Sequence, residues 1–207
     1  MGFLSALFLF RNRKKKEKTR LPPDQRWIDN ILGWGTQHRG IQPSLPNVDT
    51  ADWMLKVHGL VENPREYTWG EFMRLPQVVS ISDFHCVETW SVMDQKWEGV
   101  RFKTIIEEAV PKKKARYVLL EAYDTYTTSL PIGELMGDDI ILAHRWNDEP
   151  LPQPLGGPMR LIVPHKYGYK SIMWLREIMF SERDKLGYWE RGAFHNNADP
   201  WRRQRYN

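Results

Sequence analysis

Short alternations of apolar and polar residues run along most of the chain, and no stretch carries a long helical repeat. Residues 53–60 alternate like a half-buried strand, and residues 117–122 form a strong strand pattern. Parallel β-α-β units need long helices between their strands, and none is predicted here. The pattern therefore predicts an α+β domain with mixed sheets and short helices. Further strands are predicted at residues 77–82, 126–130, 140–143, 159–163 and 171–180.

The helical signals are few and short. Thr68 and Glu71 have the spacing of a capping box, in which each residue bonds the backbone of the other, and Pro76 stops the helix that they begin. Three weaker signals complete the prediction: a helix at residues 103–109, a helix of one or two turns from residue 131, and a turn at residues 147–150.

The composition along the chain predicts three parts. Residues 1–20 form an apolar and basic tail, residues 21–180 form the domain, and residues 181–207 form an extension that belongs to the same domain. From residue 187 onward the sequence is polar and aromatic. We expect this last stretch to wrap the surface as an extended tail.

Charge is concentrated in the tail. Residues 11–20 hold seven basic residues and one acidic residue, whereas the whole chain of 207 residues has a net charge of only +4. The remaining part is therefore mildly acidic, which argues against a nucleic-acid groove. Residues 1–10 are apolar but too short to span a bilayer, and the positive charges follow them instead of preceding them as in a secretory signal. We expect a cytoplasmic protein, with weak contact between residues 1–20 and a membrane surface as the alternative.

Cys86 is the only cysteine in the chain, so it forms no disulfide within it. The commonest role of a free cysteine is that of a small buried apolar residue. His85 is poorly placed to activate Cys86 as a nucleophile, because neighbouring side chains on a strand point to opposite faces. A zinc site needs several ligands at set spacings, and one cysteine does not supply them. A cofactor that brings its own sulfur ligands and needs one soft thiolate stays open.

Several segments in a fixed order resemble the molybdopterin-binding domain of the sulfite oxidase family, as it occurs in small stand-alone bacterial proteins. The resemblance covers residues 21–207 and is specific through the order and spacing of its parts. The segments are 36–40 (TQHRG), 83–90 (DFHCVETW), 96–100 (KWEGV), 126–131 (YTTSLP), 156–165 (GGPMRLIVPH) and 167–171 (YGYKS), followed by 188–190 (YWE) and 199–201 (DPW).

The resemblance implies a role for each matching position. Cys86 is expected to ligate the molybdenum, and Tyr126 and Arg39 are expected to face the substrate. Arg160 is expected to hold the phosphate of molybdopterin, for which its planar fork is suited. The other residues expected to contact the cofactor are His38, Arg39, His85, His165, Gly168, Lys170 and Ser171.

Structural roles remain the alternative at several of these positions. Without the resemblance, Tyr126 is a cross-strand aromatic residue and Lys170 is a solvated lysine. Arg39 is equally consistent with a loop arginine in water, and His165 with a hydrogen-bonded structural histidine.

Two departures bear on the substrate. The string after the cysteine, Val87-Glu88-Thr89-Trp90, is closer to the bacterial branch that includes methionine-sulfoxide reductases than to sulfite oxidases. Glu88 adds negative charge near the expected metal, which disfavours an anionic substrate. Leu155 stands where that branch has a polar contact to the pterin.

The resemblance implies an oxidoreductase that binds mononucleotide-free molybdopterin and transfers an oxygen atom in a two-electron step. The expected substrate is a small sulfur oxide or a sulfoxide. No haem domain follows the expected core, so electrons are expected to pass to or from a separate partner. Two other hypotheses remain: a non-catalytic protein that stores or delivers molybdopterin, and a peripheral membrane module whose functional part is the tail.

Overall fold

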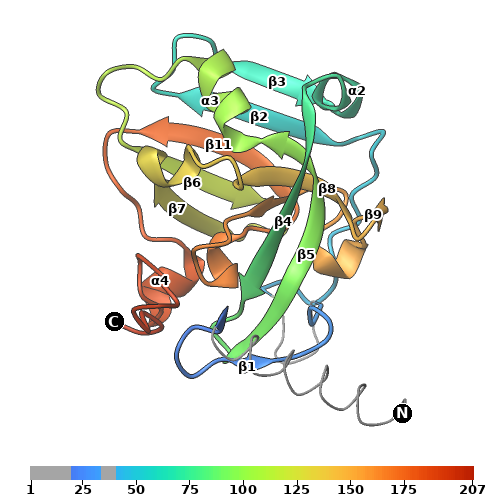
Figure 1. The fold of residues 1–207 in the computed structure, drawn as a ribbon. Helices are drawn as coiled ribbons and strands as arrows, with labels where there is room; N and C mark the ends of the chain where they lie inside the picture. The colour runs from blue at the N-terminus through green and yellow to red at the C-terminus, as the bar shows by residue number, and fades with distance from the viewer. Residues whose placement is uncertain (1–19, 34–40) are drawn as a thin grey trace, which may run out of the picture.

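Two β-sheets with a few short helices make up the protein in the computed structural model, which describes residues 20–33 and 41–207. Two long strands, β4 (Gln77–His85) and β5 (Trp90–Arg101), cross the front of the molecule in Figure 1, and the turn between them lies at its lower end, near β1 (Arg26–Trp27) and the C-terminal segment. Within these residues, no helix combines the length and the apolar character needed to span a bilayer. The expected α+β architecture with mixed sheets is confirmed.

The first sheet has six strands. Its order is β1-β5-β8-β10, with β4 also paired to β5 and β9 to β8. The pairing of β1 with β5 is parallel, and the other pairings are antiparallel. The strands are β1 (Arg26–Trp27), β4 (Gln77–His85), β5 (Trp90–Arg101), β8 (Ile141–Trp146), β9 (Glu149–Pro150) and β10 (Arg160–Ile162).

The second sheet has five strands in the order β3-β2-β11-β6-β7. Only β2 and β11 are parallel, and they come from distant parts of the chain. The strands are β2 (Met54–Gly59), β3 (Arg65–Thr68), β6 (Tyr117–Ala122), β7 (Thr127–Pro131) and β11 (Leu175–Ser181).

The helices are short, as predicted. At the start of α2 (Trp69–Met73), Thr68 Oγ1 accepts from the Glu71 N–H and the Glu71 carboxylate accepts from the Thr68 N–H, so the predicted capping box is confirmed. The predicted turn at 147–150 joins β8 to β9, and both Asn147 and Asp148 have positive φ. The remaining helices are α3 (Phe102–Ala109), α4 (Tyr188–Gly192) and the 3₁₀ turns η1 (Ile132–Leu135), η2 (Gln153–Leu155) and η3 (Gly168–Lys170).

The main core lies between the two sheets. It joins Leu120 and Ile178 of the second sheet to Val100 and Leu142 of the first, with α3 contributing Phe102. A second cluster covers the other face of the first sheet, where Ile141 and Ala143 of β8 alternate with Leu142. Burial on both faces explains why residues 140–143 are continuously apolar.

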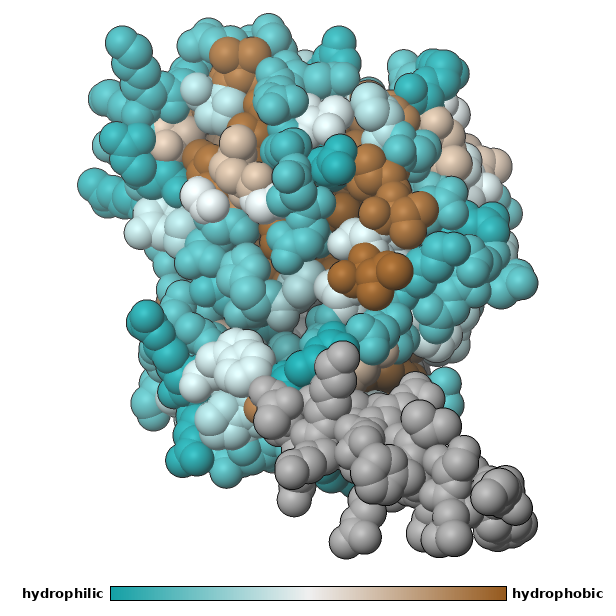
Figure 2. Space-filling model, viewed as in Figure 1, coloured by the Kyte–Doolittle hydropathy of each residue, from teal (hydrophilic) through white to brown (hydrophobic). Residues whose placement is uncertain are grey.

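The surface drawn in Figure 2 is mostly hydrophilic, but separate apolar areas interrupt it over β4 and β5. Val79 and Ile81 of β4 are both exposed there. These two residues are two apart on the strand and so point to the same face.

One strand was missed, and two expectations about other elements need correction. Strand β5 is 12 residues long and was not predicted, because polar and small residues such as Ser91, Gln95 and Gly99 occupy buried positions that strand prediction expects to be apolar. The last stretch of the chain is not extended throughout, since residues 188–192 form the helix α4. The predicted strand at 171–180 begins later, at Leu175.

Candidate functional site

Cys86 lies in the tight turn that joins β4 to β5. Its N–H donates to the Trp90 carbonyl at 2.8 Å, and its carbonyl accepts from the Thr89 N–H at 3.2 Å. Thr89 completes the turn with a φ of 69°. The Cys86 side chain is partly exposed and packs against two apolar clusters, one around Phe84 and one around Val87. The turn thus holds the sulfur at the edge of the packed interior.

The thiol has little tendency to ionise by itself. Burial raises the pKa of Cys86 to about 12, and the charge of Glu88 adds to this effect, while backbone hydrogen bonds and Arg160 act in the opposite direction. Such a thiol is not a nucleophile at neutral pH. A bound soft metal deprotonates its thiol ligand, because the positive charge replaces the proton. The arrangement therefore suits a metal ligand better than a nucleophile.

A chain of hydrogen bonds between side chains supports the backbone of Cys86 at its carbonyl group. Gln25 Nε2 donates to the Cys86 carbonyl at 3.0 Å, and Ser91 Oγ donates to Gln25 Oε1 at 3.1 Å. His85 Nδ1 lies 2.8 Å from Ser91 Oγ. Because the serine proton is given to Gln25, Nδ1 must carry the histidine proton, which leaves Nε2 as the acceptor nitrogen.

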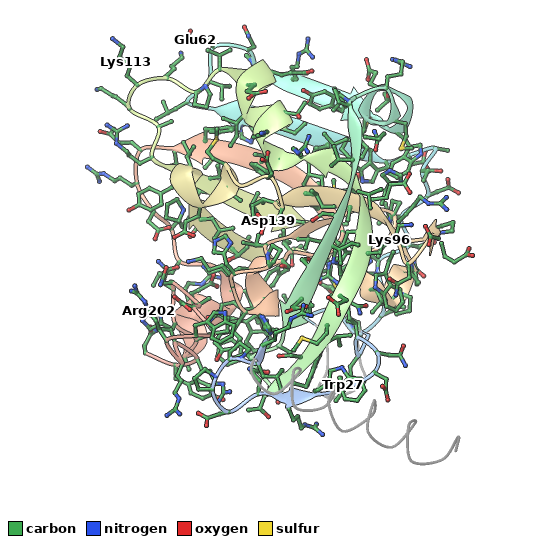
Figure 3. The ribbon with its side chains drawn as sticks, viewed as in Figure 1. Trp27, Glu62, Lys96, Lys113, Asp139 and Arg202 are labelled. Carbon is green, nitrogen blue, oxygen red and sulfur yellow. The ribbon has the colours of Figure 1, made fainter. Side chains whose placement is uncertain are left out.

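His85 is buried and neutral. Burial lowers its pKa to about 4, and Asp83 opposes this shift only in part. Its ring also makes an edge contact with Trp201, with 6.4 Å between ring centroids. The C-terminal segment therefore covers the residue beside the cysteine. Figure 3 shows side chains crowded at this end of the molecule, between the labelled Arg202 and the labelled Trp27 of β1.

Arg160, at the start of β10, is a buried arginine without an acidic partner in the described part of the chain. Its two terminal nitrogens donate to the carbonyls of Leu155 and Ser171, each at 2.8 Å, and its Nε has no hydrogen-bond partner within residues 20–33 and 41–207. The guanidinium also lies over the Phe84 ring at 5.2 Å. Burial lowers its pKa to about 9, and the interaction with Cys86 opposes this shift. Two carbonyl dipoles do not neutralise a buried positive charge, so an anion is the partner that this site lacks.

Ser171 and Gly168, which both follow β10 in the sequence, help to form the surroundings of Arg160. Ser171 is buried, accepts the Val163 N–H at its hydroxyl oxygen at 2.9 Å, and offers its carbonyl to Arg160. A Cβ at Gly168 would come within 2.5 Å of the Phe84 ring. The close approach that Gly168 permits is thus to Phe84, the ring that also contacts Arg160.

Lys170, which the resemblance assigns to the cofactor, is held by three groups of the protein itself. Its ammonium group is fully buried and donates to the Ser129 carbonyl at 2.9 Å, to Glu190 Oε1 at 2.5 Å and to Asn196 Oδ1 at 3.2 Å. An ammonium group has three protons, and all three are taken. Burial lowers the pKa of Lys170, whereas Glu190 acts to raise it. The geometry gives Lys170 no proton for a cofactor phosphate and ties η3 to α4 instead.

His165 lies at the rim of the same segment. Its Nε2 is 2.6 Å from Glu134 Oε2, and both side chains are partly exposed. Lys166, next in sequence, is buried and bonds Asn197 Oδ1 at 2.8 Å and Glu134 Oε1 at 3.2 Å. Burial acts to raise the pKa of Glu134, but the hydrogen bond from His165 and the charge of Lys166 outweigh it, so the pKa is lowered.

Tyr126 is buried in the main core just before β7. Its hydroxyl donates to the Tyr169 carbonyl at 2.7 Å. Burial raises its pKa well above the usual value. This geometry makes Tyr126 a support for the turn η3 and does not direct its proton toward a substrate. His38 and Arg39 lie outside the described residues.

Within the described residues, no group of three or more His, Cys, Asp or Glu side chains is arranged to hold a metal ion. The one residue here suited to a soft metal is Cys86. Arg160, whose charge acts on Cys86, is suited to an anion.

Comparison with known proteins decides the family. The model of the oxidoreductase molybdopterin binding domain matches residues 42–189. The oxidoreductase YuiH of Bacillus subtilis is 36% identical over 200 residues, which cover 97% of this chain and 98% of the relative. The chain belongs to the molybdopterin-binding oxidoreductases. It is therefore a molybdenum-dependent oxidoreductase of the sulfite oxidase type, and its cofactor is molybdopterin.

Other members of this family match over a smaller share of their length. A putative protein-methionine-sulfoxide reductase subunit, YedZ1 of Azospira oryzae, is 34% identical over 69% of this chain and 54% of its own. The catalytic subunit MsrP of the protein-methionine-sulfoxide reductase of Campylobacter jejuni is 28% identical over 83% of this chain and 65% of its own. The chain thus spans about half to two thirds of these two relatives.

A solved structure confirms the predicted fold. The sulfane dehydrogenase SoxCD of Paracoccus pantotrophus superposes with a TM-score of 0.63 over 69% of this chain and 41% of that chain. At 22% sequence identity, the likeness establishes the fold alone.

The residues around Cys86 fit molybdopterin, which is an anion that brings sulfur ligands of its own. The unpaired Nε of Arg160 points to a missing acceptor, and the partly exposed sulfur can complete a metal site. Cys86 would hold the metal and Arg160 an anionic group.

Several residues of the site were not predicted. Gln25 and Ser91 had no signal, because a polar residue that bonds a backbone carbonyl leaves no pattern in the sequence. Glu190 lies in the segment 188–190 that resembles the family, and Lys166 follows His165 directly. Both residues lie in or next to segments that carry the resemblance, but the resemblance did not predict that they are buried charges.

Proposed function

We propose that this oxidoreductase reduces a small neutral sulfoxide at a molybdenum ligated by Cys86. The reaction takes two electrons and two protons, breaks the S–O bond, and gives the sulfide and one water. When bound, the mononucleotide-free molybdopterin supplies the metal that exchanges the electron pair and the oxygen atom. The single observation that carries the proposal is that the half-buried Cys86 and Arg160, a buried cation with no acidic partner in the described residues, both pack near Phe84.

Charge supports a sulfoxide over sulfite. Glu88 is exposed two residues after Cys86, and its charge adds to burial, the main cause, in raising the pKa of the thiol. A negative charge at this point repels a dianion such as sulfite and is indifferent to a neutral sulfoxide. The relatives named as methionine-sulfoxide reductases agree with this choice.

Electrons come from a separate partner in this proposal. The relative from Campylobacter is named as a catalytic subunit and extends beyond the matched region. The cytoplasmic location, and the contact of residues 1–20 with a membrane surface, stay predictions, because residues 1–19 lie outside the described part of the chain.

The test uses full-length protein from a host that makes molybdopterin. The wild-type protein should contain about one molybdenum per chain, matching its single cysteine ligand. With reduced methyl viologen as electron donor, it should turn over methionine sulfoxide or dimethyl sulfoxide faster than it oxidises sulfite with an artificial acceptor. Bound molybdenum without turnover of any sulfoxide or sulfite would indicate a storage protein instead.

A pair of variants in the same turn tests the metal ligand. Cys86→Ser should change the Mo(V) resonance spectrum and abolish turnover, because oxygen replaces sulfur at the metal. Thr89→Asn is the matched control, since asparagine tolerates the positive φ at that position and leaves the sulfur in place. An unchanged spectrum in Cys86→Ser would remove Cys86 from the metal.

A further inference from the structure

Tyr167 lies in the segment that runs beside the cysteine turn. It pairs with His85 in an isolated parallel bridge, and its N–H donates to the Ala198 carbonyl at 2.8 Å. Its ring forms a buried cluster with Val87 and Ala198, and Cys86 packs against this cluster. The ring therefore belongs to the apolar cluster on which Cys86 packs.

The hydroxyl of Tyr167 has no hydrogen-bond partner among the described residues, although Tyr167 is fully buried. Buried phenols normally find one. The other tyrosines of this region do: Tyr126 donates to the Tyr169 carbonyl, and Tyr169 donates to the His195 carbonyl at 2.6 Å. Of these three tyrosines, only Tyr167 has a hydroxyl without a hydrogen-bond partner among the described residues.

The neighbours of the Tyr167 ring do not supply an acceptor. Tyr169 stacks on it with 6.4 Å between ring centroids, and the Arg205 guanidinium lies 5.8 Å from the ring centroid. A guanidinium has donors only, so Arg205 cannot receive the phenolic proton. Phenylalanine would make the same ring contacts without leaving a buried donor unpaired. The packing alone therefore does not account for the hydroxyl.

We propose that the Tyr167 hydroxyl donates a hydrogen bond to an acceptor atom of bound molybdopterin. This inference rests on the proposed function, because it requires the cofactor to lie next to Cys86. Arg160 and Tyr167 then hold the cofactor from two different segments, β10 and the start of η3. Each is a buried donor that lacks a protein partner at one atom.

The test compares Tyr167→Phe with Tyr169→Phe, which removes a hydroxyl of the same kind two residues away. Both variants and the wild type are made with and without molybdopterin, by use of hosts that do or do not synthesise it. Two quantities are measured: the melting temperature of the cofactor-free protein and the rate at which the loaded protein loses molybdenum and pterin.

Tyr167→Phe should melt at or above the wild-type temperature when cofactor-free, because it loses only an unpaired donor. It should release the cofactor about tenfold faster, the effect of one ordinary hydrogen bond. Tyr169→Phe should melt lower when cofactor-free, because the His195 carbonyl loses its donor.

Three results would contradict the inference, and they are distinguishable. A wild type without molybdenum overturns the proposed function itself. A loaded wild type with equal cofactor release from Tyr167→Phe leaves the proposed function standing and refutes the role of the hydroxyl. A cofactor-free Tyr167→Phe that melts as low as Tyr169→Phe shows that the hydroxyl has a partner within the protein.

Discussion

The buried ion pair between Lys170 and Glu190 allows a quantitative prediction of stability. Both side chains are fully buried, and 2.5 Å separates Lys170 Nζ from Glu190 Oε1. The same carboxylate oxygen also accepts from Thr128 Oγ1 at 2.5 Å, while Oε2 has no partner among the described residues. Removal of one member of such a pair leaves the other as an isolated buried charge.

We expect Glu190→Ala to lower the free energy of unfolding by about 3–5 kcal/mol, the range for breaking a buried pair from one side. For a chain of this size that corresponds to a melting temperature lower by about 6–20 °C. The assay is urea unfolding of the cofactor-free protein, followed by circular dichroism and tryptophan fluorescence.

The double variant Lys170→Met with Glu190→Leu is the control. It removes both charges and keeps apolar volume, so it should be less destabilised than Glu190→Ala alone. If Glu190→Ala costs less than about 1 kcal/mol, the range of an exposed pair, then water reaches the pair and the argument fails. Lys170→Met and Glu190→Leu are also measured one at a time. A double variant whose loss of stability equals the sum of these two losses would show that Lys170 and Glu190 do not interact.

Three further predictions concern the neighbourhood of the site and the first sheet. Gln25→Leu should cost about 0.5–1.5 kcal/mol in urea unfolding, because the part-buried Cys86 carbonyl loses its side-chain donor and keeps only the Thr89 N–H, and the thiol should react faster with maleimide in the loosened turn; an unchanged reaction rate would contradict this role. Gly168→Ala should cost about 1–3 kcal/mol, because its Cβ would overlap the Phe84 ring; wild-type stability would show that the ring moves aside freely. Burial lowers the pKa of His144 from 6.5, so the unfolded chain binds the proton more readily and stability falls as the pH drops below 6.5. His144→Asn should make unfolding between pH 7.5 and pH 5 less dependent on pH, and an unaltered dependence would exclude His144 as its source.

The sequence was sufficient for the fold class but not for every element. The capping box at Thr68 and Glu71 was readable because both partners are local and the spacing is fixed. Strand β5 was not, because polar and small residues such as Ser91, Gln95 and Gly99 stand at buried positions and hide the apolar alternation on which strand prediction depends. Helix α4 was missed because it has only five residues, and what holds Glu190 in it is a partner 20 residues away.

The candidate site, like the fold, could be predicted from the sequence only in part. Cys86 and Arg160 were predicted, and the structure gives each a geometry suited to the predicted role. The resemblance also assigned Lys170 to the cofactor, because the segment 167–171 matches one that lines the cofactor pocket in the family. Only the three-dimensional structure shows the distant Glu190 that takes its charge, so a matching residue type did not establish a matching role.

The distribution of charge around the cysteine follows from this correction. Lys170 is neutralised by Glu190, and Lys166 is held by Glu134 and Asn197. Of these three buried cations, Arg160 alone has no carboxylate partner in the described residues, so the attraction for an anion is concentrated at one residue. Uncharged hydrogen-bond donors can add to the binding of a cofactor that a single cation attracts. The Tyr167 hydroxyl, which has no partner among the described residues, belongs to the cluster on which Cys86 packs and is such a donor, so cofactor release should respond to Tyr167→Phe although no charge is removed.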